Sequence, residues 1–245
     1  MSEKESAWFE RLGFRHNPFM IKPYAYSDEL HGYKPYIQKI NASIKDGKVV
    51  FIEGDYGVGK TSVLKQVIDE FKGQKKLIYY SANRIEGGID FDSLIKGRAG
   101  FFGKMFGNMP KDLILMVDEA QKMNMHDCEK IETLIESGYF KSVVLVSDDM
   151  KKVNLSKKLR KMIGKDVIDL GAAFTEQNAQ KMVKDRLGDE SDFMPSKVVK
   201  MIYLKSNKNP RRMLENLEDV AKYAVEEKDR KKVQESDVKE ALKDK

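Results

Sequence analysis

Residues 48–61 read KVVFIEGDYGVGKT. The stretch begins with a short apolar run that ends at Gly54, and the residues after Thr61 carry apolar side chains at helical spacing. Residues 54–61 fit the pattern G-x-x-x-x-G-K-[ST], which marks a phosphate-binding loop when it lies between a strand and a helix. The sequence therefore predicts a strand, a phosphate-binding loop and a helix, in that order.

The predicted loop carries the groups that bind the phosphates of a nucleotide. Its glycines let main-chain N–H groups face the phosphates, and the helix N-terminus adds the positive end of its dipole. Lys60 would reach the β- and γ-phosphates and support catalysis, and Thr61 would be a Mg²⁺ ligand. The alternative, an ordinary glycine-rich turn, leaves the pairing of Lys60 with Thr61 unexplained. The nucleotide-binding residues predicted in the loop are Gly54, Asp55, Tyr56, Gly57, Val58, Gly59, Lys60, Thr61 and Ser62.

A second apolar run, LILMVDE at residues 113–119, ends in two acids. A polar end on a buried strand requires a reason, because burying a carboxylate without a partner is costly. Asp118 would contribute to nucleotide binding by holding Mg²⁺ through water, and Glu119 would polarise the attacking water as general base. The alternative is a strand that simply enters solvent at its acidic end. The upstream phosphate-binding loop favours the catalytic interpretation.

Further apolar runs indicate the fold class. They lie at residues 77–82, 142–147 and 167–170, separated by helical or polar stretches, as in a mostly parallel α/β sheet. From Phe174 onward every pattern is helical. We therefore expect a five-stranded parallel sheet flanked by helices and followed by a small all-helical domain. The predicted segments are an N-terminal linker and first helix at 1–45, the α/β nucleotide-binding core at 46–172 and the helical domain at 173–245.

The composition excludes several classes of function. Hydrophobic residues make up 41% of the 245 residues and charged residues 34%, as in a soluble globular chain. The longest apolar runs are far shorter than the roughly 20 residues that cross a bilayer, so we expect no membrane insertion and a cytoplasmic location. A single cysteine, Cys128, cannot form an internal disulfide, and three scattered histidines do not predict a zinc cluster.

Positive charge is concentrated in several segments, among them residues 196–212, which hold six cations and no acid. The net charge is only +6, but residues 151–165 hold seven cations and no acid, and residues 96–104 mix Lys96, Arg98 and Lys104 with aromatic side chains and glycines. Such segments suit DNA, with cations on phosphates and rings on bases or sugars. For residues 96–104, a protein partner or a loop that tucks its phenylalanines into the core explains the pattern equally well. For residues 151–165, the alternative is a solvated face near a subunit interface.

The two motifs resemble those of AAA+ ATPases that carry a small helical lid domain. The segments VDEAQ at 117–121, LGFRHNPF at 12–19 and NPRRML at 209–214 are similar to the branch that contains archaeal origin-recognition initiators and transposition- or secretion-type ATPases. The resemblance covers about residues 12 to 242. It implies ATP and Mg²⁺ as cofactors, ATP hydrolysis as the activity and a lid domain at 173–245.

The resemblance also assigns residues that sense the nucleotide. It places sensor 1 at Ser147, a hydroxyl able to bond the γ-phosphate or the attacking water, with Asp148 as the competing candidate. Sensor 2 falls on Arg211, whose planar fork suits phosphate oxygens, with Arg212 as its neighbour. A solvated basic helix end is the alternative for Arg211.

The sequence departs from the family at the arginine finger. Met162 stands where the family commonly has the arginine, so either Arg160 serves or a standard finger is absent. Residues 14–26 and 30–42 resemble the linker that packs against adenine. A hydrophobic strap that completes the core is the alternative for residues such as Phe19.

The leading hypothesis is a Mg-ATP-binding ATPase that acts on DNA as a replication-initiator- or transposition-type nucleotide switch. One alternative is a protein-remodelling or secretion-coupled ATPase whose contact is the segment 96–107. Another is a nucleotide-dependent scaffold with little hydrolysis, suggested by the missing standard finger. The resemblance also makes assembly into a homo-oligomer possible.

Overall fold

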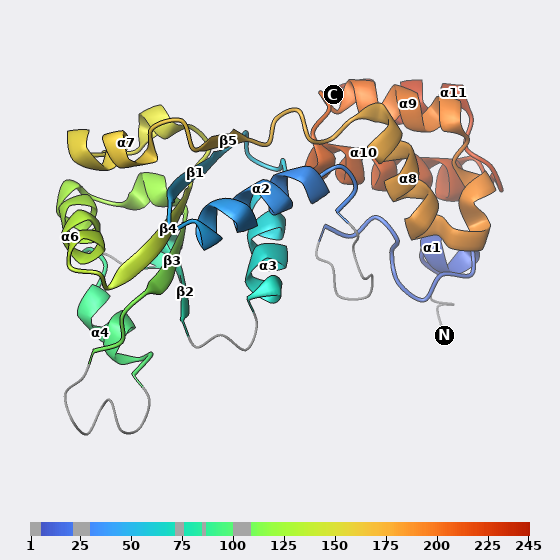
Figure 1. The fold of residues 1–245 in the computed structure, drawn as a ribbon. Coiled ribbons are helices and arrows are strands. Elements are labelled where there is room, and N and C mark those ends of the chain that lie inside the picture. The colour runs from blue at the N-terminus through green and yellow to red at the C-terminus, as the bar shows by residue number, and fades with distance from the viewer. Residues whose placement is uncertain (1–5, 22–29, 72–75, 85–86, 100–108) are drawn as a thin grey trace. The chain divides into compact units, whose positions relative to one another are not determined.

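The computed structural model describes residues 6–21, 30–71, 76–84, 87–99 and 109–245 (Figure 1). These residues form two compact units. The sheet unit comprises Tyr33–Gly171, and the helical unit combines residues 1–32 with Ala172–Lys245. The predicted segment 1–45 is therefore divided between the units, because its helix belongs with the sheet and the described residues before it belong with the C-terminal helices.

The sheet unit is built on five parallel strands in the order β2-β3-β4-β1-β5. The sheet and the helical unit confirm the predicted fold class, because each apolar run in the sequence forms a strand. In the register, Val50 of β1 pairs with Val144 of β4, and Leu115 of β3 pairs with Val143 of β4. The strands are β1 (Val49–Glu53), β2 (Leu77–Ser81), β3 (Leu113–Asp118), β4 (Phe140–Val146) and β5 (Val167–Asp169).

Helices cover both faces of this sheet, which explains why its strands are apolar on both sides. Helices α2 (Lys34–Lys45) and α3 (Lys60–Glu70) contact each other, and α2 also contacts β1 and β4 (Figure 1). The other face packs against α4 (Phe91–Lys96), α6 (Met125–Glu136) and α7 (Lys157–Ile163). Successive side chains of each strand point alternately to the two faces of the sheet.

Short helical turns link these elements at the edge of the sheet. They are η1 (Ala82–Arg84), η2 (Ala120–Lys122) and η3 (Met150–Lys152).

Helix α6 begins with a reciprocal cap, in which the side chain of Asn124 accepts from the Asp127 N–H and the Asp127 carboxylate accepts from the Asn124 N–H.

The helical unit has its own core. Trp8 and Phe19 stack with ring centroids 5.9 Å apart, and both are buried among the side chains of the C-terminal helices. Phe19 therefore completes this core in the structure, in line with the hydrophobic-strap interpretation. The elements are α1 (Trp8–Arg11), α8 (Glu176–Leu187), η4 (Gly188–Phe193), α9 (Ser196–Lys205), α10 (Pro210–Lys222), the π-helical turn η5 (Tyr223–Glu227) and α11 (Glu235–Ala241).

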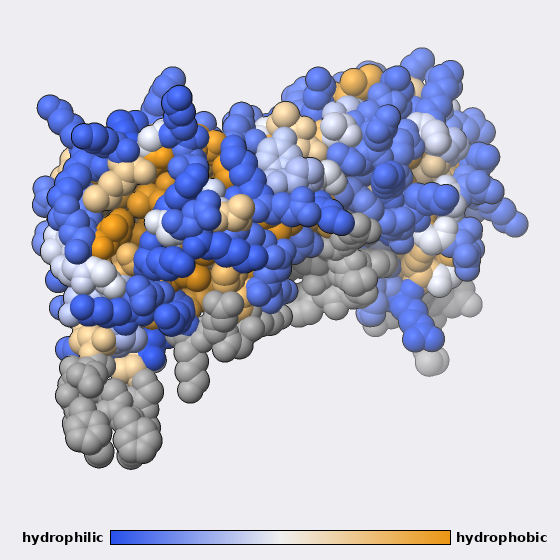
Figure 2. Space-filling view, in the orientation of Figure 1, coloured by the Kyte–Doolittle hydropathy of each residue, from blue (hydrophilic) through white to orange (hydrophobic). Residues whose placement is uncertain are grey.

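The surface is mostly hydrophilic, as expected for a chain in which charged residues make up 34% of the sequence. Hydrophilic side chains cover most of the face seen in Figure 2, and hydrophobic ones show between the helices of the sheet unit. In the part of the chain that the structure describes, no helix has both the length and the apolar character needed to span a bilayer.

Candidate functional site

The phosphate-binding loop joins the end of β1 to the start of α3. All three of its glycines have φ angles that side-chain-bearing residues rarely adopt, 151° at Gly54, 90° at Gly57 and 96° at Gly59. A Cβ on Gly54 would lie only 2.9 Å from the Cγ2 atom of Val58. The backbone path of the loop therefore requires glycine at these positions, and Gly59 leads directly into the first turn of α3.

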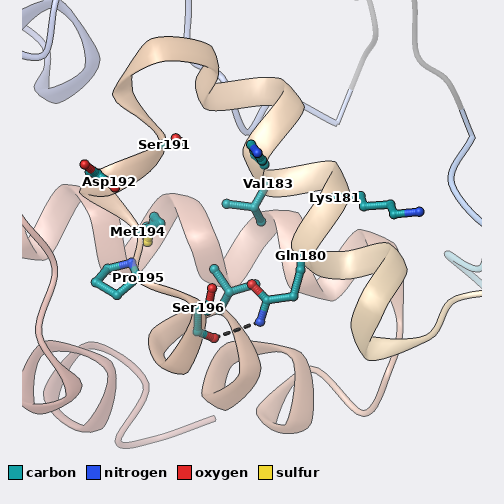
Figure 3. A pocket seen from close by; sticks show the side chains of 10 residues that line it. Gln180, Lys181, Val183, Ser191, Asp192, Met194, Pro195 and Ser196 are labelled. Carbon is teal, nitrogen blue, oxygen red and sulfur yellow. Dashed lines mark hydrogen bonds between the residues drawn. The ribbon is translucent and has the colours of Figure 1, made fainter.

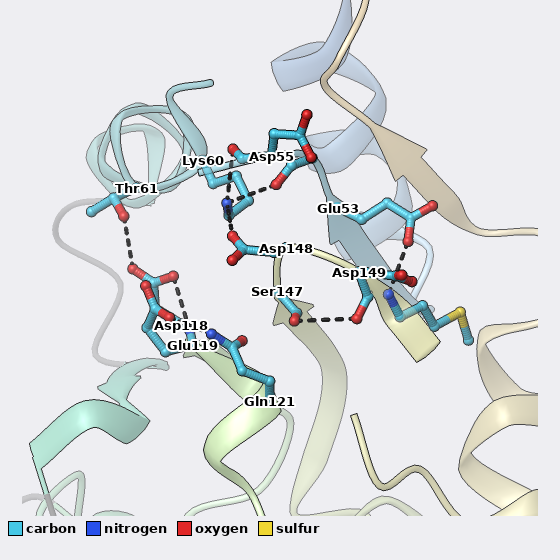
Figure 4. Close-up of polar contacts among 12 residues, drawn as sticks. Glu53, Asp55, Lys60, Thr61, Asp118, Glu119, Gln121, Ser147, Asp148 and Asp149 are labelled. Carbon is cyan, nitrogen blue, oxygen red and sulfur yellow. Dashed lines mark hydrogen bonds and ion pairs between the residues drawn. The ribbon is translucent and has the colours of Figure 1, made fainter. Parts of the chain in front are cut away.

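Lys60 lies folded into this loop. Its ammonium donates to the main-chain oxygens of Gly54 at 2.8 Å and Asp55 at 3.2 Å, and it lies 2.5 Å from Oδ1 of Asp148 (Figure 4). The side chain is only 9% exposed. The ammonium of Lys60, the first residue of α3, thus joins the loop to Asp148, which follows β4.

Asp118 ends β3 at the same edge of the sheet, because the carboxyl ends of parallel strands lie together. Its buried carboxylate accepts hydrogen bonds from Thr61 Oγ1 at 3.0 Å, Tyr79 OH at 3.2 Å and the Glu119 N–H at 3.0 Å. Carboxylate and hydroxyl oxygens are the ligands that Mg²⁺ prefers. Thr61 and Asp118 therefore fit a magnesium ion.

Glu119 follows in a strained backbone conformation. Its φ of 58° and ψ of 42° lie in the left-handed region, which a residue with a side chain rarely adopts. The amide of Gln121 donates to Oε2 of Glu119, while Oε1 of Gln121 is buried without a partner among the described residues. Such strain is characteristic of functional sites, and here it falls on the predicted general base.

Ser147 and Asp148 follow β4 and occupy different surroundings (Figure 4). The buried hydroxyl of Ser147 donates to the main-chain oxygen of Asp149 at 3.4 Å. The carboxylate of Asp148 contacts Lys60, and its main-chain oxygen accepts from the Gly54 N–H at 3.2 Å. Of the two candidates for sensor 1, Asp148 is the one that contacts the phosphate-binding loop in the described residues.

Tyr33 supports the loop from the N-terminal end of α2. Its hydroxyl donates to the main-chain oxygen of Val58, and a Cβ on Gly59 would lie 3.5 Å from the same hydroxyl. Burial raises the pKa of Tyr33 above its ordinary value, with a smaller contribution from Tyr36, so the phenol stays a donor. Tyr33, Tyr79 and Gln121 are site residues that the sequence did not predict. Gln121 stands in the segment VDEAQ, but no motif assigns a contact to any of the three side chains.

The remaining predicted site residues are distributed as follows. Ser62 is half-buried, whereas Asp55 and Tyr56 are exposed at the loop surface. Arg160 is an exposed residue of α7 in the sheet unit, and Arg211 belongs to α10 of the helical unit. The guanidinium of Arg211 pairs with Glu215, with 3.2 Å between Nε and Oε1. The exposed Arg212 is its neighbour.

The predicted basic segments are only partly described. All seven cations of the segment after β4 are exposed, namely Lys151, Lys152, Lys157, Lys158, Arg160, Lys161 and Lys165. Lys158 pairs with Glu136 of α6. Of the segment 96–104, Lys96 ends α4, and residues 100–104 lie outside the described residues.

The helical unit contains a separate cavity of about 350 Å³ between α8, η4 and the start of α9 (Figure 3). Val183 contributes to its apolar wall, and Lys181 and Lys184 contribute cations. At its edge the amide of Gln180 donates to the main-chain oxygen of Ser196 at 2.8 Å. None of the residues predicted to bind or hydrolyse nucleotide lines this cavity.

The strand order of the sheet and the loop at residues 54–61 together define the sheet unit as a P-loop fold. Neither family models nor curated proteins match the sequence. Solved structures do match the fold. Cdc6p from Pyrobaculum aerophilum has a TM-score of 0.68 at 16% identity, covering 92% of this chain and 70% of that one.

Two further matches come from other organisms. The Drosophila ORC bound to DNA has a TM-score of 0.68 at 17% identity, covering 99% of this chain and 67% of that one. The Thermotoga maritima RuvB Holliday junction branch migration motor has a TM-score of 0.61 at 18% identity, covering 86% and 67%. These proteins are AAA+ ATPases, so the chain has the AAA+ fold and the resemblance seen in the sequence is confirmed.

Proposed function

We propose that the chain binds Mg-ATP at residues 54–62 and hydrolyses it. The observation that carries this proposal is the meeting of three groups at one sheet edge. The Lys60 ammonium lies inside the loop, and the Thr61 hydroxyl lies 3.0 Å from the Asp118 carboxylate. An ammonium for phosphate oxygens and two oxygen ligands for Mg²⁺ are the groups that a P-loop ATPase requires.

Each residue then has a distinct task. The loop N–H groups and Lys60 bind phosphate, and Thr61 and Asp118 hold Mg²⁺, which neutralises charge on the phosphate oxygens when it is bound. Glu119 accepts the proton of the attacking water. Ser147, whose hydroxyl can bond the γ-phosphate or the attacking water, serves as sensor 1.

The arginines complete the proposed machinery. Arg211 of the helical unit serves as sensor 2, because its fork suits phosphate oxygens. Arg160 would act on the nucleotide of another copy in a homo-oligomer. Its side chain is exposed on α7, which is what an arginine finger requires.

Nucleotide binding and turnover test the enzymatic proposal. We expect Lys60→Ala to weaken Mg-ATP binding at least about tenfold, because the Lys60 ammonium is a main phosphate contact of the loop. Lys65→Ala, at an exposed position of the same helix, should bind as the parent protein does. Isothermal titration with ATP and ADP provides the measurement. A folded parent protein that binds neither nucleotide in the presence of Mg²⁺ would contradict the proposal.

The general base is tested separately. Glu119→Gln should retain ATP and lose turnover by ~100-fold or more, since general-base catalysis contributes ~10²–10⁴. Glu129→Gln, an exposed residue of α6, is the matched control. Equal, slow hydrolysis by the parent protein and by Glu119→Gln would instead favour a nucleotide-dependent scaffold.

We further propose that the ATPase acts on DNA, as a replication-initiator- or transposition-type switch. Two observations support this role. The similar structures include an ORC bound to DNA and a Holliday junction branch migration motor. The run of exposed cations at 151–165 suits the phosphate backbone without base preference.

Salt dependence tests the DNA role. The logarithm of the affinity should fall linearly with the logarithm of salt concentration, because lysine and arginine release counterions from DNA. Lys157→Ala/Lys161→Ala should reduce that slope. Lys197→Ala/Lys200→Ala is the control, since those cations already pair with Glu235 and Glu176. If neither duplex nor single-stranded DNA binds at low salt, with or without ATP, a protein partner becomes the better candidate.

A further inference from the structure

We propose that the carboxylate of Asp148 takes the place of a nucleotide phosphate on Lys60 and must leave when a nucleoside diphosphate or triphosphate binds. Asp148 thereby lowers the affinity of the loop for nucleotide. This inference rests on the proposed nucleotide binding at residues 54–62. It adds a residue that sets how tightly that site binds its ligand.

The Lys60 ammonium has as many acceptors around it in the structure as it has N–H groups. A lysine ammonium has three N–H groups and no acceptor. In the structure these groups meet three acceptors, namely Gly54 O at 2.8 Å, Asp55 O at 3.2 Å and Asp148 Oδ1 at 2.5 Å. A phosphate oxygen can reach the ammonium only if one of these acceptors gives way.

Asp148 is the acceptor best able to leave. Gly54 O and Asp55 O belong to the main chain of the loop and cannot rotate away by themselves, as the carboxylate of a side chain can. The Asp148 side chain is 31% exposed, whereas that of Lys60 is 9% exposed, so rotation about the Asp148 side-chain bonds carries its carboxylate toward solvent. The main chain stays in place meanwhile, because the Gly54 N–H donates to Asp148 O at 3.2 Å.

Charge gives the exchange its direction. A carboxylate and a phosphate are both anions, and two anions beside one partly buried ammonium repel each other. The carboxylate therefore stabilises the loop without nucleotide and opposes the loop with nucleotide. Removing its charge should favour the nucleotide-bound form.

Two substitutions at Asp148 and one beside it test the inference. Asp148→Asn keeps the shape of the side chain without its charge, and Asp148→Ala removes the acceptor altogether. Each variant lacks the carboxylate, so the test can be made with whichever of the two folds. Asp149→Asn is the matched control, because the Asp149 carboxylate accepts from the Lys151 N–H and an asparagine can do the same. The measurement is the dissociation constant for Mg-ADP and Mg-ATP at fixed salt.

We expect both Asp148 variants to bind the two nucleotides about tenfold more tightly, or ~1.4 kcal/mol, than the parent protein. Asp149→Asn should stay within about twofold, since its charge does not contact Lys60. Tight binding by Asp148→Asn together with undetectable binding by the parent protein would also support the inference.

Two results would overturn it. If the parent protein binds nucleotide and both Asp148 variants bind equally or more weakly, Asp148 does not occlude the site, while the proposed function stands. If the parent protein, both Asp148 variants and Asp149→Asn all fail to bind, the proposed function falls and this inference falls with it.

Discussion

The hydroxyl of Tyr33 donates a hydrogen bond to the main-chain oxygen of Val58, at an O···O distance of 2.5 Å. The contact joins the N-terminal end of α2 to the phosphate-binding loop across 25 positions of sequence. Tyr33 is only 3% exposed, and its ring lies against Gly59. The loop is therefore supported by a side chain that lies outside the loop pattern of residues 54–61.

Loss of this hydroxyl should weaken both the fold and the site. In Tyr33→Phe the ring remains and the Val58 oxygen loses its partner, which costs roughly 1–3 kcal/mol of unfolding free energy for a buried acceptor. Chemical denaturation gives the change, and titration with Mg-ATP should show weaker binding. The control is Tyr36→Phe on the same helix. An unchanged unfolding free energy in Tyr33→Phe would show that the contact contributes nothing.

The sheet and its loop were predictable because their signals are local. The run at residues 48–54 and the GxxxxGKT pattern predict a strand and a helix from adjacent residues alone, and both are present. Tyr33 and Tyr79 were not predictable in this way. Their partners, Val58 and Asp118, are brought to them only by the packing of α2 and the pairing of β2 with β3.

Two neighbouring residues show a second limit of sequence reasoning. Successive side chains within a strand point to opposite faces, but Ser147 and Asp148 follow β4, so the sequence alone does not show which of them lies against the loop. In the structure it is the Asp148 carboxylate that contacts Lys60. Similarly, the sequence does not show what Phe19 packs against. In the structure it lies among side chains of the C-terminal helices, which are far from it in the sequence.

A buried carboxylate of α6 fixes the helix that carries the basic segment. Glu132 accepts hydrogen bonds from the Ser156 hydroxyl and, at 3.2 Å, from the Leu159 N–H at the start of α7. We expect Glu132→Ala to lower the unfolding free energy by about 2 kcal/mol, because two donors lose a charged acceptor in a buried place.

The matched control joins the same two helices at the surface. Glu136 pairs with Lys158, and both side chains are about half exposed. Glu136→Ala should therefore cost less than about 1 kcal/mol. Equal losses in the two variants, measured by urea denaturation, would mean that burial of Glu132 has no special effect.

Arg160 provides a test of assembly. If it acts as a finger on the nucleotide of a second copy, ATP turnover per molecule should rise with protein concentration, and Arg160→Ala should remove that rise. A finger contributes ~10³–10⁵ in rate where it operates, so even partial use would be visible. Lys45→Ala removes an exposed cation from α2 and serves as control. Turnover that does not depend on concentration in the parent protein would argue against a finger.

The buried thiol of Cys128 makes the free energy of unfolding depend on pH in the alkaline range. Burial raises the pKa of its thiol to about 11, with the Asp127 carboxylate and then that of Glu132 adding to the effect. An unfolded thiol has a lower pKa, 9.0. Above pH 9 the unfolded chain therefore releases a proton that the folded chain keeps, and the folded state loses stability as the pH rises toward 11.

Comparison with Cys128→Ala isolates this effect from the titration of lysines and tyrosines. The difference in unfolding free energy between the two proteins should stay constant below pH 9 and should shift in favour of Cys128→Ala between pH 9 and about 11. In the same range the folded thiol should react slowly with iodoacetamide, because the thiolate is the nucleophile. A constant difference up to pH 11, or rapid alkylation of the folded protein at pH 8, would show that the thiol ionises in the folded state as readily as in the unfolded chain.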